Sequence, residues 1–82
     1  MSVASIPEIE SRILSGQPIK FAELKKVCDH YFGEPRIKGS HHIYKMPWAG
    51  NPRINIQKFG KDAKAYQIRQ VAAALVKLHG AF

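Results

Sequence analysis

The chain has 82 residues with a formal net charge of +7, and 45% of the residues are hydrophobic, a composition typical of one small folded domain and not of a disordered segment. No run approaches the roughly 18 consecutive apolar residues that a membrane-spanning helix requires, and the opening "MSVASIPEIE" lacks the basic and apolar regions of a secretory signal. The single cysteine, Cys28, cannot form an internal disulfide, so these features predict a reduced, cytoplasmic protein with no membrane association.

Two helices are expected in the first part of the chain. The segment "SIPEIESRILSG" begins with Ser5, which can cap a helix, carries Pro7 in its first turn and stops at Gly16. After the linker "GQP", the segment "IKFAELKKVCDHYFG" has apolar residues at helical spacing, and Gly33 is a suitable C-terminal cap. The apolar face of this second helix would consist of Phe21, Leu24, Val27, Cys28 and Tyr31.

The pattern then changes to that of short strands. Three are expected: "EPRIKG", where Pro35 limits the segment to a sheet edge, "HHIYKM", and "RINIQKF", where Ile54 and Ile56 point inward and polar residues outward. The segments "PWAGNP" (47–52) and "GKDAK" would form a loop and a turn. A third helix is expected in "AYQIRQVAAALVKL", with an apolar face made of Ile68, Val71, Ala72, Leu75 and Leu78.

This order of elements predicts an α+β fold. A three-stranded antiparallel sheet would pack with one face on helices in the order α-β-β-β-α, with an extra N-terminal helix. Residues 1–19 would form this helical extension and a linker, and residues 20–82 the main domain. The other face of the sheet stays open in this arrangement, which raises the question of what covers it.

The charge is distributed unevenly along the chain. Residues 1–35 contain four basic and five acidic residues, a net charge of −1, whereas residues 36–82 contain nine basic residues and one acid, a net charge of +8. Such a one-sided positive field favours a polyanion or an acidic protein as partner. A basic surface kept for solubility is the alternative interpretation.

Two adjacent histidines follow a glycine and a serine in "KGSHHIYKM". Gly39 can adopt backbone conformations closed to other residues, so the Gly-Ser pair could turn the chain into a strand that begins at His41. Because successive strand residues point to opposite faces, and Ile43 is expected to face the helices, His42 and Tyr44 would face the open side. His41 could still protrude past the edge of the core, so periodicity does not decide which imidazole is functional.

An imidazole titrates near neutral pH and can take a proton from a ribose 2′-hydroxyl or give one to a leaving 5′-oxygen. Neighbouring cations could offset the charge that develops on the phosphate, and Lys38, Lys45 and Arg53 are the local candidates. A passive histidine on a half-exposed strand is the alternative. Trp48, in the following loop, could stack on a base, insert into a partner protein or pack over the sheet edge.

Other chemistries find little support. The cysteine and the histidines lack the spacing of a four-ligand zinc site; these residues are Cys28, His30, His41, His42 and His79. No Gly-rich phosphate loop or nucleophile elbow occurs, and Asp62 is the lone acid after residue 34, which disfavours two-carboxylate and metal-dependent mechanisms. We therefore expect neither a metal nor a cofactor.

The segments "KGSHHIYKMP", "NPRINIQ" and "AYQIRQVAAAL" resemble the HicA-type toxins of bacterial toxin–antitoxin systems, over about residues 20–78. Members of that family are small, basic mRNA interferases with a double-stranded-RNA-binding-like α-β-β-β-α fold and a histidine in a GSH-type motif at a strand start. The resemblance implies that His41 is catalytic, with His42 as the second candidate because some members carry the histidine one position later. It also implies a cognate HicB-type antitoxin as partner.

Three segments depart from the family's pattern: residues 1–19, the "PWAGNP" loop and "GKDAKAY" before the last helix. The last helix itself corresponds to the family's last helix. Gln67, Arg69 and Gln70 would lie near its start, where an ordinary solvated face explains them as well.

The leading hypothesis is a toxin that cleaves mRNA as a metal-independent endoribonuclease, with His41 or His42 as general acid or base. Gly39 would be the structural pivot. The expected RNA contacts are Lys38, Ser40, Tyr44, Lys45, Arg53, Lys58, Lys61, Lys64 and Arg69. A non-catalytic RNA-binding module is one alternative, and a protein-interaction domain using Trp48 and the N-terminal helix is another. That helix could also mediate a homo-oligomer.

Overall fold

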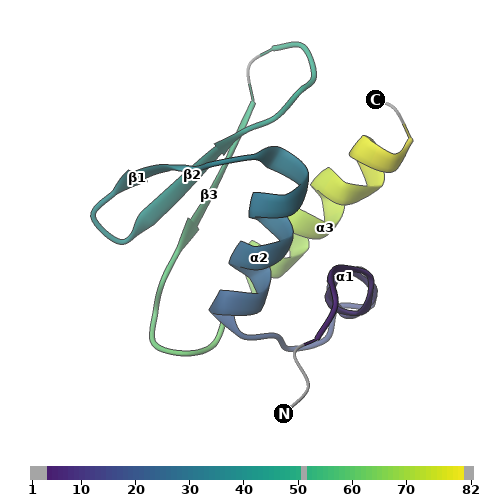
Figure 1. Ribbon diagram of the computed structural model, residues 1–82, viewed down its shortest axis with the longest axis vertical. Coiled ribbons are helices and arrows are strands. Elements are labelled where there is room, and N and C mark those ends of the chain that lie inside the picture. The colour runs from purple at the N-terminus through teal and green to yellow at the C-terminus, as the bar shows by residue number, and fades with distance from the viewer. Residues whose placement is uncertain (1–3, 51, 81–82) are drawn as a thin grey trace.

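The computed structural model describes residues 4–50 and 52–80, which form three helices and one three-stranded sheet (Figure 1). The elements are α1 (Ile6–Leu14), α2 (Phe21–Phe32), β1 (Arg36–Lys38), β2 (His41–Lys45), β3 (Arg53–Gln57) and α3 (Ala65–His79). The predicted α+β class is confirmed, and the order after α1 is compatible with α-β-β-β-α. Parts of two predictions fall outside the described residues: both ends of the predicted domains (1–3 and 81–82) and Asn51 of the predicted loop.

All three strands pair antiparallel in the order β1-β2-β3. A two-residue turn joins β1 to β2, because Lys38 pairs directly with His41. Gly39 in this turn has a φ of +60°, a conformation that residues other than glycine rarely adopt, which agrees with the pivot expected at this position. β1 is short, exposed and at the edge of the sheet, as Pro35 indicated.

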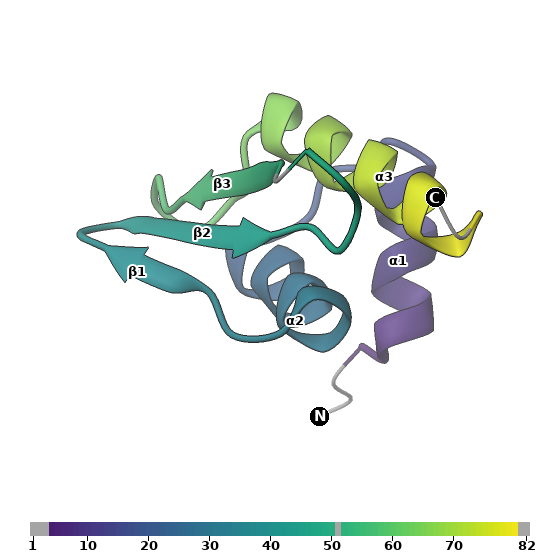
Figure 2. The ribbon, with the colours of Figure 1, turned by 90° about the horizontal axis from the view of Figure 1, so that it is seen from above.

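The helices α2 and α3 pack against the sheet, and α1 packs against α2 and α3 on the far side from the sheet (Figure 2). Ser5 caps α1 by accepting a hydrogen bond from the Glu8 backbone N–H, and Gly33 caps α2 with a φ of +82°. One core cluster joins the sheet to all three helices. Its fully buried aliphatic residues are Ile9, Ile13, Leu24, Val27, Ile56, Val71 and Leu75.

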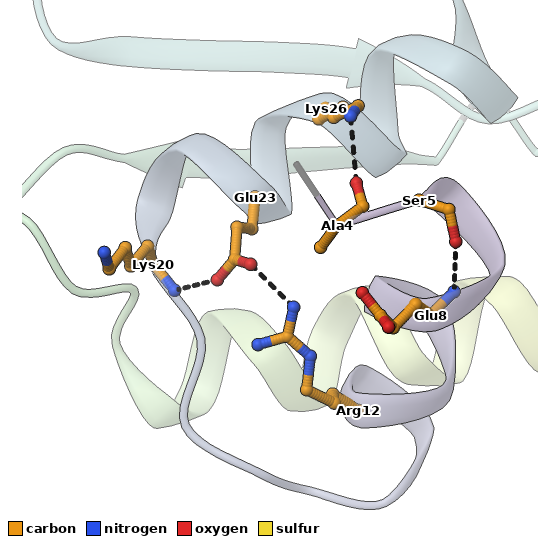
Figure 3. Close-up of polar contacts among 7 residues, drawn as sticks. All are labelled: Ala4, Ser5, Glu8, Arg12, Lys20, Glu23 and Lys26. Atoms are coloured by element: carbon orange, nitrogen blue, oxygen red, sulfur yellow. Dashed lines mark hydrogen bonds and ion pairs between the residues drawn. The ribbon is translucent and has the colours of Figure 1, made fainter. Parts of the chain in front are cut away.

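Helix α1 is an integral part of this core, since Ile9 and Ile13 are each only 1% exposed. Figure 3 shows how its polar face is joined to α2: Arg12 forms an ion pair of 2.6 Å with Glu23. The same carboxylate accepts a hydrogen bond of 3.1 Å from the Lys20 backbone N–H. The pKa of Glu23 is lowered, mainly by this backbone hydrogen bond and to a smaller extent by the Arg12 guanidinium. Residues 1–19 and 20–82 therefore do not have separate cores.

A second polar cluster joins α1 to α2 and α3. The buried carboxylate of Glu10 accepts a hydrogen bond of 2.5 Å from the Tyr31 hydroxyl and also contacts the His79 imidazole Nε2. The Tyr31 and His79 rings meet edge to face. The hydrogen bond to Glu10 raises the pKa of Tyr31. Nothing in the spacing of these residues along the sequence indicated this cluster.

The prediction for the two faces of β2 is wrong. Tyr44 pairs with Ile54, and His42 pairs with Ile56, so His42 and Tyr44 lie on the face that the two buried isoleucines share. That face packs on the helices, and Ile43 lies on the open side with only partial burial. The pairing with β3 decides the orientation because the sheet has to present one continuous apolar face to the core.

The face of α3 differs from the prediction in two places. Ala74 is buried, whereas Ala72 and Leu78 are only half-buried. Gln67, for which a solvated helix face was one of the interpretations, is fully buried. Trp48 packs against the core cluster with the Lys77 ammonium of α3 5.0 Å from its ring centre. None of the helices within 4–50 and 52–80 has the length and apolar character needed to cross a membrane.

Candidate active site on the open face of the sheet

The face of the sheet that is turned away from α2 and α3 is called the open face below. Its membership follows from the strand register, because paired residues share a face. Lys38, His41 and Gln57 form one row across the three strands, and Arg36, Ile43 and Asn55 form the next. The pair Lys45 and Arg53 completes the open face.

The open face is positively charged. Its four cations, Arg36, Lys38, Lys45 and Arg53, are all exposed. All six acidic residues of the chain lie in the described part, and each stands in a helix or a connection, not in a strand. Without carboxylates to neutralise them, four cations on one small surface produce a field that attracts polyanions.

His41 is half-buried on this face, at the first position of β2. Its Nδ1 lies 3.1 Å from the Asn55 side-chain oxygen Oδ1. With the amide in this orientation the oxygen can only accept, so the imidazole Nδ1–H donates, and in the neutral ring Nε2 then carries the lone pair. The ring is thereby oriented, and the nitrogen that remains can accept a proton.

The turn beside His41 is held by β3 as well. The Gln57 side-chain Nε2 donates a hydrogen bond of 3.0 Å to Ser40 Oγ, and the Lys58 backbone N–H donates one of 3.3 Å to the Ser40 carbonyl. These contacts fix the position of Ser40, and through it the start of β2. Ser40 therefore supports the turn beside the imidazole.

His42 has a different environment. Its ring lies 5.4 Å from the ring of Phe21 at the start of α2, and its Nδ1 is buried with no hydrogen-bond partner within the described residues. A ring packed in this way cannot readily reach an RNA on the open face. Of the two candidate histidines, the structure therefore places His41 on the accessible side.

Tyr44 was predicted to contact RNA, and its burial contradicts this. The side chain is 0% exposed, and its hydroxyl donates a hydrogen bond of 2.6 Å to Asp29 in α2. Burial, followed by this hydrogen bond, raises the pKa of Tyr44. Tyr44 thus connects the sheet to α2 and belongs to the core.

The other predicted RNA contacts are divided among several places. Lys38, Lys45 and Arg53 share the open face with His41. Lys58 and Lys61 instead line a hollow with Lys20 at the start of α2. The Lys64 ammonium lies 5.0 Å from the ring centre of Phe59, and Arg69 lines a hollow with residues 16–18. Only part of the predicted basic set therefore surrounds the imidazole.

Five residues near His41 were missed as site residues: Arg36, Asn55, Gln57, Tyr66 and Gln70. The strand register could have identified the first three, because the alternation in β3 already places Asn55 and Gln57 on the open face. Tyr66 and Gln70 come from α3, and no short-range pattern indicates that this helix reaches β3 at that point.

Cys28 is buried in the core and lies outside this site. Burial raises the pKa of the Cys28 thiol to about 12, which keeps it protonated and unreactive. Across residues 4–50 and 52–80, no group of three His, Cys, Asp or Glu side chains is arranged to hold a metal ion. No protein-family model, curated protein or solved structure matches the chain.

Proposed function

We propose that this chain is a metal-independent endoribonuclease that cleaves mRNA and acts as the toxin of a HicA-type toxin–antitoxin system. The observation that carries the proposal is the position of His41: an oriented imidazole, with Nε2 as its proton acceptor, on a sheet face that holds four cations and no acid. The α+β architecture supports it, because the order after α1 is compatible with the double-stranded-RNA-binding-like fold that the resemblance implies.

In the proposed reaction, His41 Nε2 takes the proton of a ribose 2′-hydroxyl. The 2′-oxygen forms a bond to the adjacent phosphorus, and the bond from phosphorus to the 5′-oxygen breaks as that oxygen takes a proton from water. Lys38, opposite His41, and Arg36 in the next row offset the charge that develops on the phosphate oxygens. Asn55 is a positioning residue, since it acts through the imidazole.

The open face also fits the proposed antitoxin. An acidic HicB-type partner that covered this face would neutralise its four cations and block His41 at the same time. The protein-interaction hypothesis has less support, because α1 uses Ile9 and Ile13 inside its own core. A homo-oligomer through α1 would have to use its remaining exposed surface, which includes Leu14.

The test is cleavage of a labelled RNA single strand by purified protein in the presence of a chelator. We expect the wild type to cleave, and His41→Ala to reduce the rate by roughly 10²- to 10⁴-fold, the range that general acid–base groups contribute. His41→Ala should keep the melting temperature of the wild type, since its ring lies outside the core. His42→Ala should lower the melting temperature because it removes the packing against Phe21.

Intact RNA with the wild type would overturn the nuclease proposal, as would full activity in His41→Ala. If the wild type binds RNA in a salt-dependent way but never cleaves it, the non-catalytic RNA-binding module is the correct function. Induction in cells extends the test: growth should stop with the wild type and continue with His41→Ala.

A further inference from the structure

A small pocket lies beside His41, where the open face meets the first turns of α3. It has a volume of about 230 Å³ and is lined by His41, Asn55, Gln57, Tyr66 and Gln70. The walls come from β2 and β3 on one side and from α3 on the other. Apart from the imidazole, none of the lining side chains can carry a charge at neutral pH. The pocket thus differs from the cationic rows next to it.

Tyr66 supplies the aromatic wall of this pocket. Its side chain is 52% exposed, although its hydroxyl accepts a hydrogen bond of 3.3 Å from the Gln67 side-chain Nε2. Gln67 is 0% exposed, and the same nitrogen donates 3.1 Å to the Gln57 carbonyl of β3. The Tyr66 ring is thus held at its hydroxyl by Gln67 and remains half exposed to solvent, so it offers a preorganised surface for stacking.

Amide groups supply the polar lining. Within the described residues, the Gln70 side chain makes no hydrogen bond, and the Asn55 amide uses only its oxygen. Tyr66 and Gln70 stand four positions apart on α3 and therefore share one helix face. An amide that both donates and accepts, next to an aromatic ring, is the combination that recognises the edge and the face of a nucleobase.

We infer that this pocket binds one unpaired nucleobase of the RNA, with the base stacked on Tyr66 and its edge toward Gln70. This inference rests on the proposed function, because it places the base next to the phosphate at His41. The division of the surface supports it: phosphates would contact the cationic rows and the base would enter the uncharged pocket. A base held in a duplex is already stacked and paired, so the pocket selects single-stranded RNA.

The test measures binding without cleavage, using a short RNA single strand whose ribose 2′-hydroxyls are methylated. Tyr66→Ala should weaken binding by roughly 5- to 100-fold, in line with the contribution of base–aromatic stacking. Tyr66→Phe, which keeps the ring, should bind within about twofold of the wild type. Gln70→Ala should change which base is preferred in a set of strands that differ at one position.

Phe59→Ala is the matched control variant, because Phe59 is another exposed aromatic residue, 44% exposed, outside the pocket. It should bind the strand as the wild type does. Strands without bases, and duplexes of the same sequence, should bind equally to wild type and Tyr66→Ala. The inference is overturned if Tyr66→Ala weakens binding to the base-free strand as much as it weakens binding to the intact strand. It is also overturned if Tyr66→Phe binds the intact strand as weakly as Tyr66→Ala does. A protein that cleaves nothing but shows the expected binding pattern would refute the nuclease alone.

Discussion

The two faces of one sheet carry different residues and have different surroundings. On the covered face, Ile54, Ile56 and Tyr44 are buried against α2 and α3, and the Tyr44 hydroxyl donates a hydrogen bond to Asp29. On the open face, four cations and His41 surround a single partly buried Ile43. Adjacent residues of β2 therefore alternate between the two environments within one strand.

The difference separates stability from the proposed chemistry. The covered face removes apolar area from water and contributes to folding, whereas the cations of the open face repel one another and contribute little to it. His41 and His42 show the contrast most directly, since the first is held by one amide and the second by a ring in the core. Substitutions on the two faces should accordingly change different measured quantities.

The largest contrast is expected for two isoleucines on opposite faces. Ile56→Ala removes a fully buried side chain and should lower the free energy of unfolding by about 2–5 kcal/mol. Ile43→Ala, the matched variant on the open face, should cost about 1 kcal/mol or less. Urea denaturation of both variants measures the two values, and equal losses would mean that the open face is not a free surface in solution.

Asn55→Ala should slow RNA cleavage by about tenfold, because the imidazole loses the contact that orients it. Stability should stay close to that of the wild type. Asn55→Asp is the informative companion: a carboxylate accepts from the same ring nitrogen and stabilises the imidazolium, so the pH–rate profile should move to higher pH. A profile that does not move in Asn55→Asp would show that His41 is not the group that titrates.

The charge of the open face can be tested with two double variants that each remove two positive charges. Arg36→Gln with Lys38→Gln should reduce the slope of log affinity against log salt by roughly 0.7 for each lost charge. Lys25→Gln with Lys26→Gln alters α2, where Lys25 pairs with Asp29, and should leave the slope unchanged. Filter binding to single-stranded RNA over a salt series measures both. Equal changes would place the RNA elsewhere.

The smallest effect concerns the covered face at high pH. Because the pKa of Tyr44 is raised above its ordinary value of 10.0 in the folded chain, its contribution to stability is complete below about pH 10 and falls as the pH rises further. Tyr44→Phe should cost about 1 kcal/mol at neutral pH and show a smaller loss of melting temperature above pH 10. The pKa of Tyr31 is also raised, so the stability of Tyr44→Phe should still fall somewhat at alkaline pH. If wild type and Tyr44→Phe lose the same amount of melting temperature above pH 10, Tyr44 is not the group responsible for the alkaline loss of stability.

Local patterns were sufficient to predict most elements and their caps. Helical spacing, Ser5 and Gly33 indicated α1 and α2, and the alternation of Ile54 and Ile56 indicated β3 and its buried side. The segment "HHIYKM" is less informative, because Ile43 and Tyr44 are both apolar enough to be buried. Pairing with β3 decides between them, and this information lies outside the segment itself.

The site could be predicted only in part, for a similar reason. His41, Lys38, Lys45 and Arg53 lie in or beside the strand pair that the sequence indicated. Tyr66 and Gln70 reach the same place from α3, and the pocket that they complete depends on how that helix packs. Such long-range packing leaves no local signal, since an exposed tyrosine in an amphipathic helix has the same pattern whatever lies beside it.

The cluster of Glu10, Tyr31 and His79 has a consequence for synthesis of the protein. Glu10 and His79 are separated by 69 positions, so α1 cannot complete its contacts before translation has passed the end of α3. Until then the apolar stripe of Ile9 and Ile13 lacks part of its covering, and the wall that α3 adds beside His41 is missing too. A nascent chain therefore exposes this incomplete apolar surface until α3 has left the ribosome.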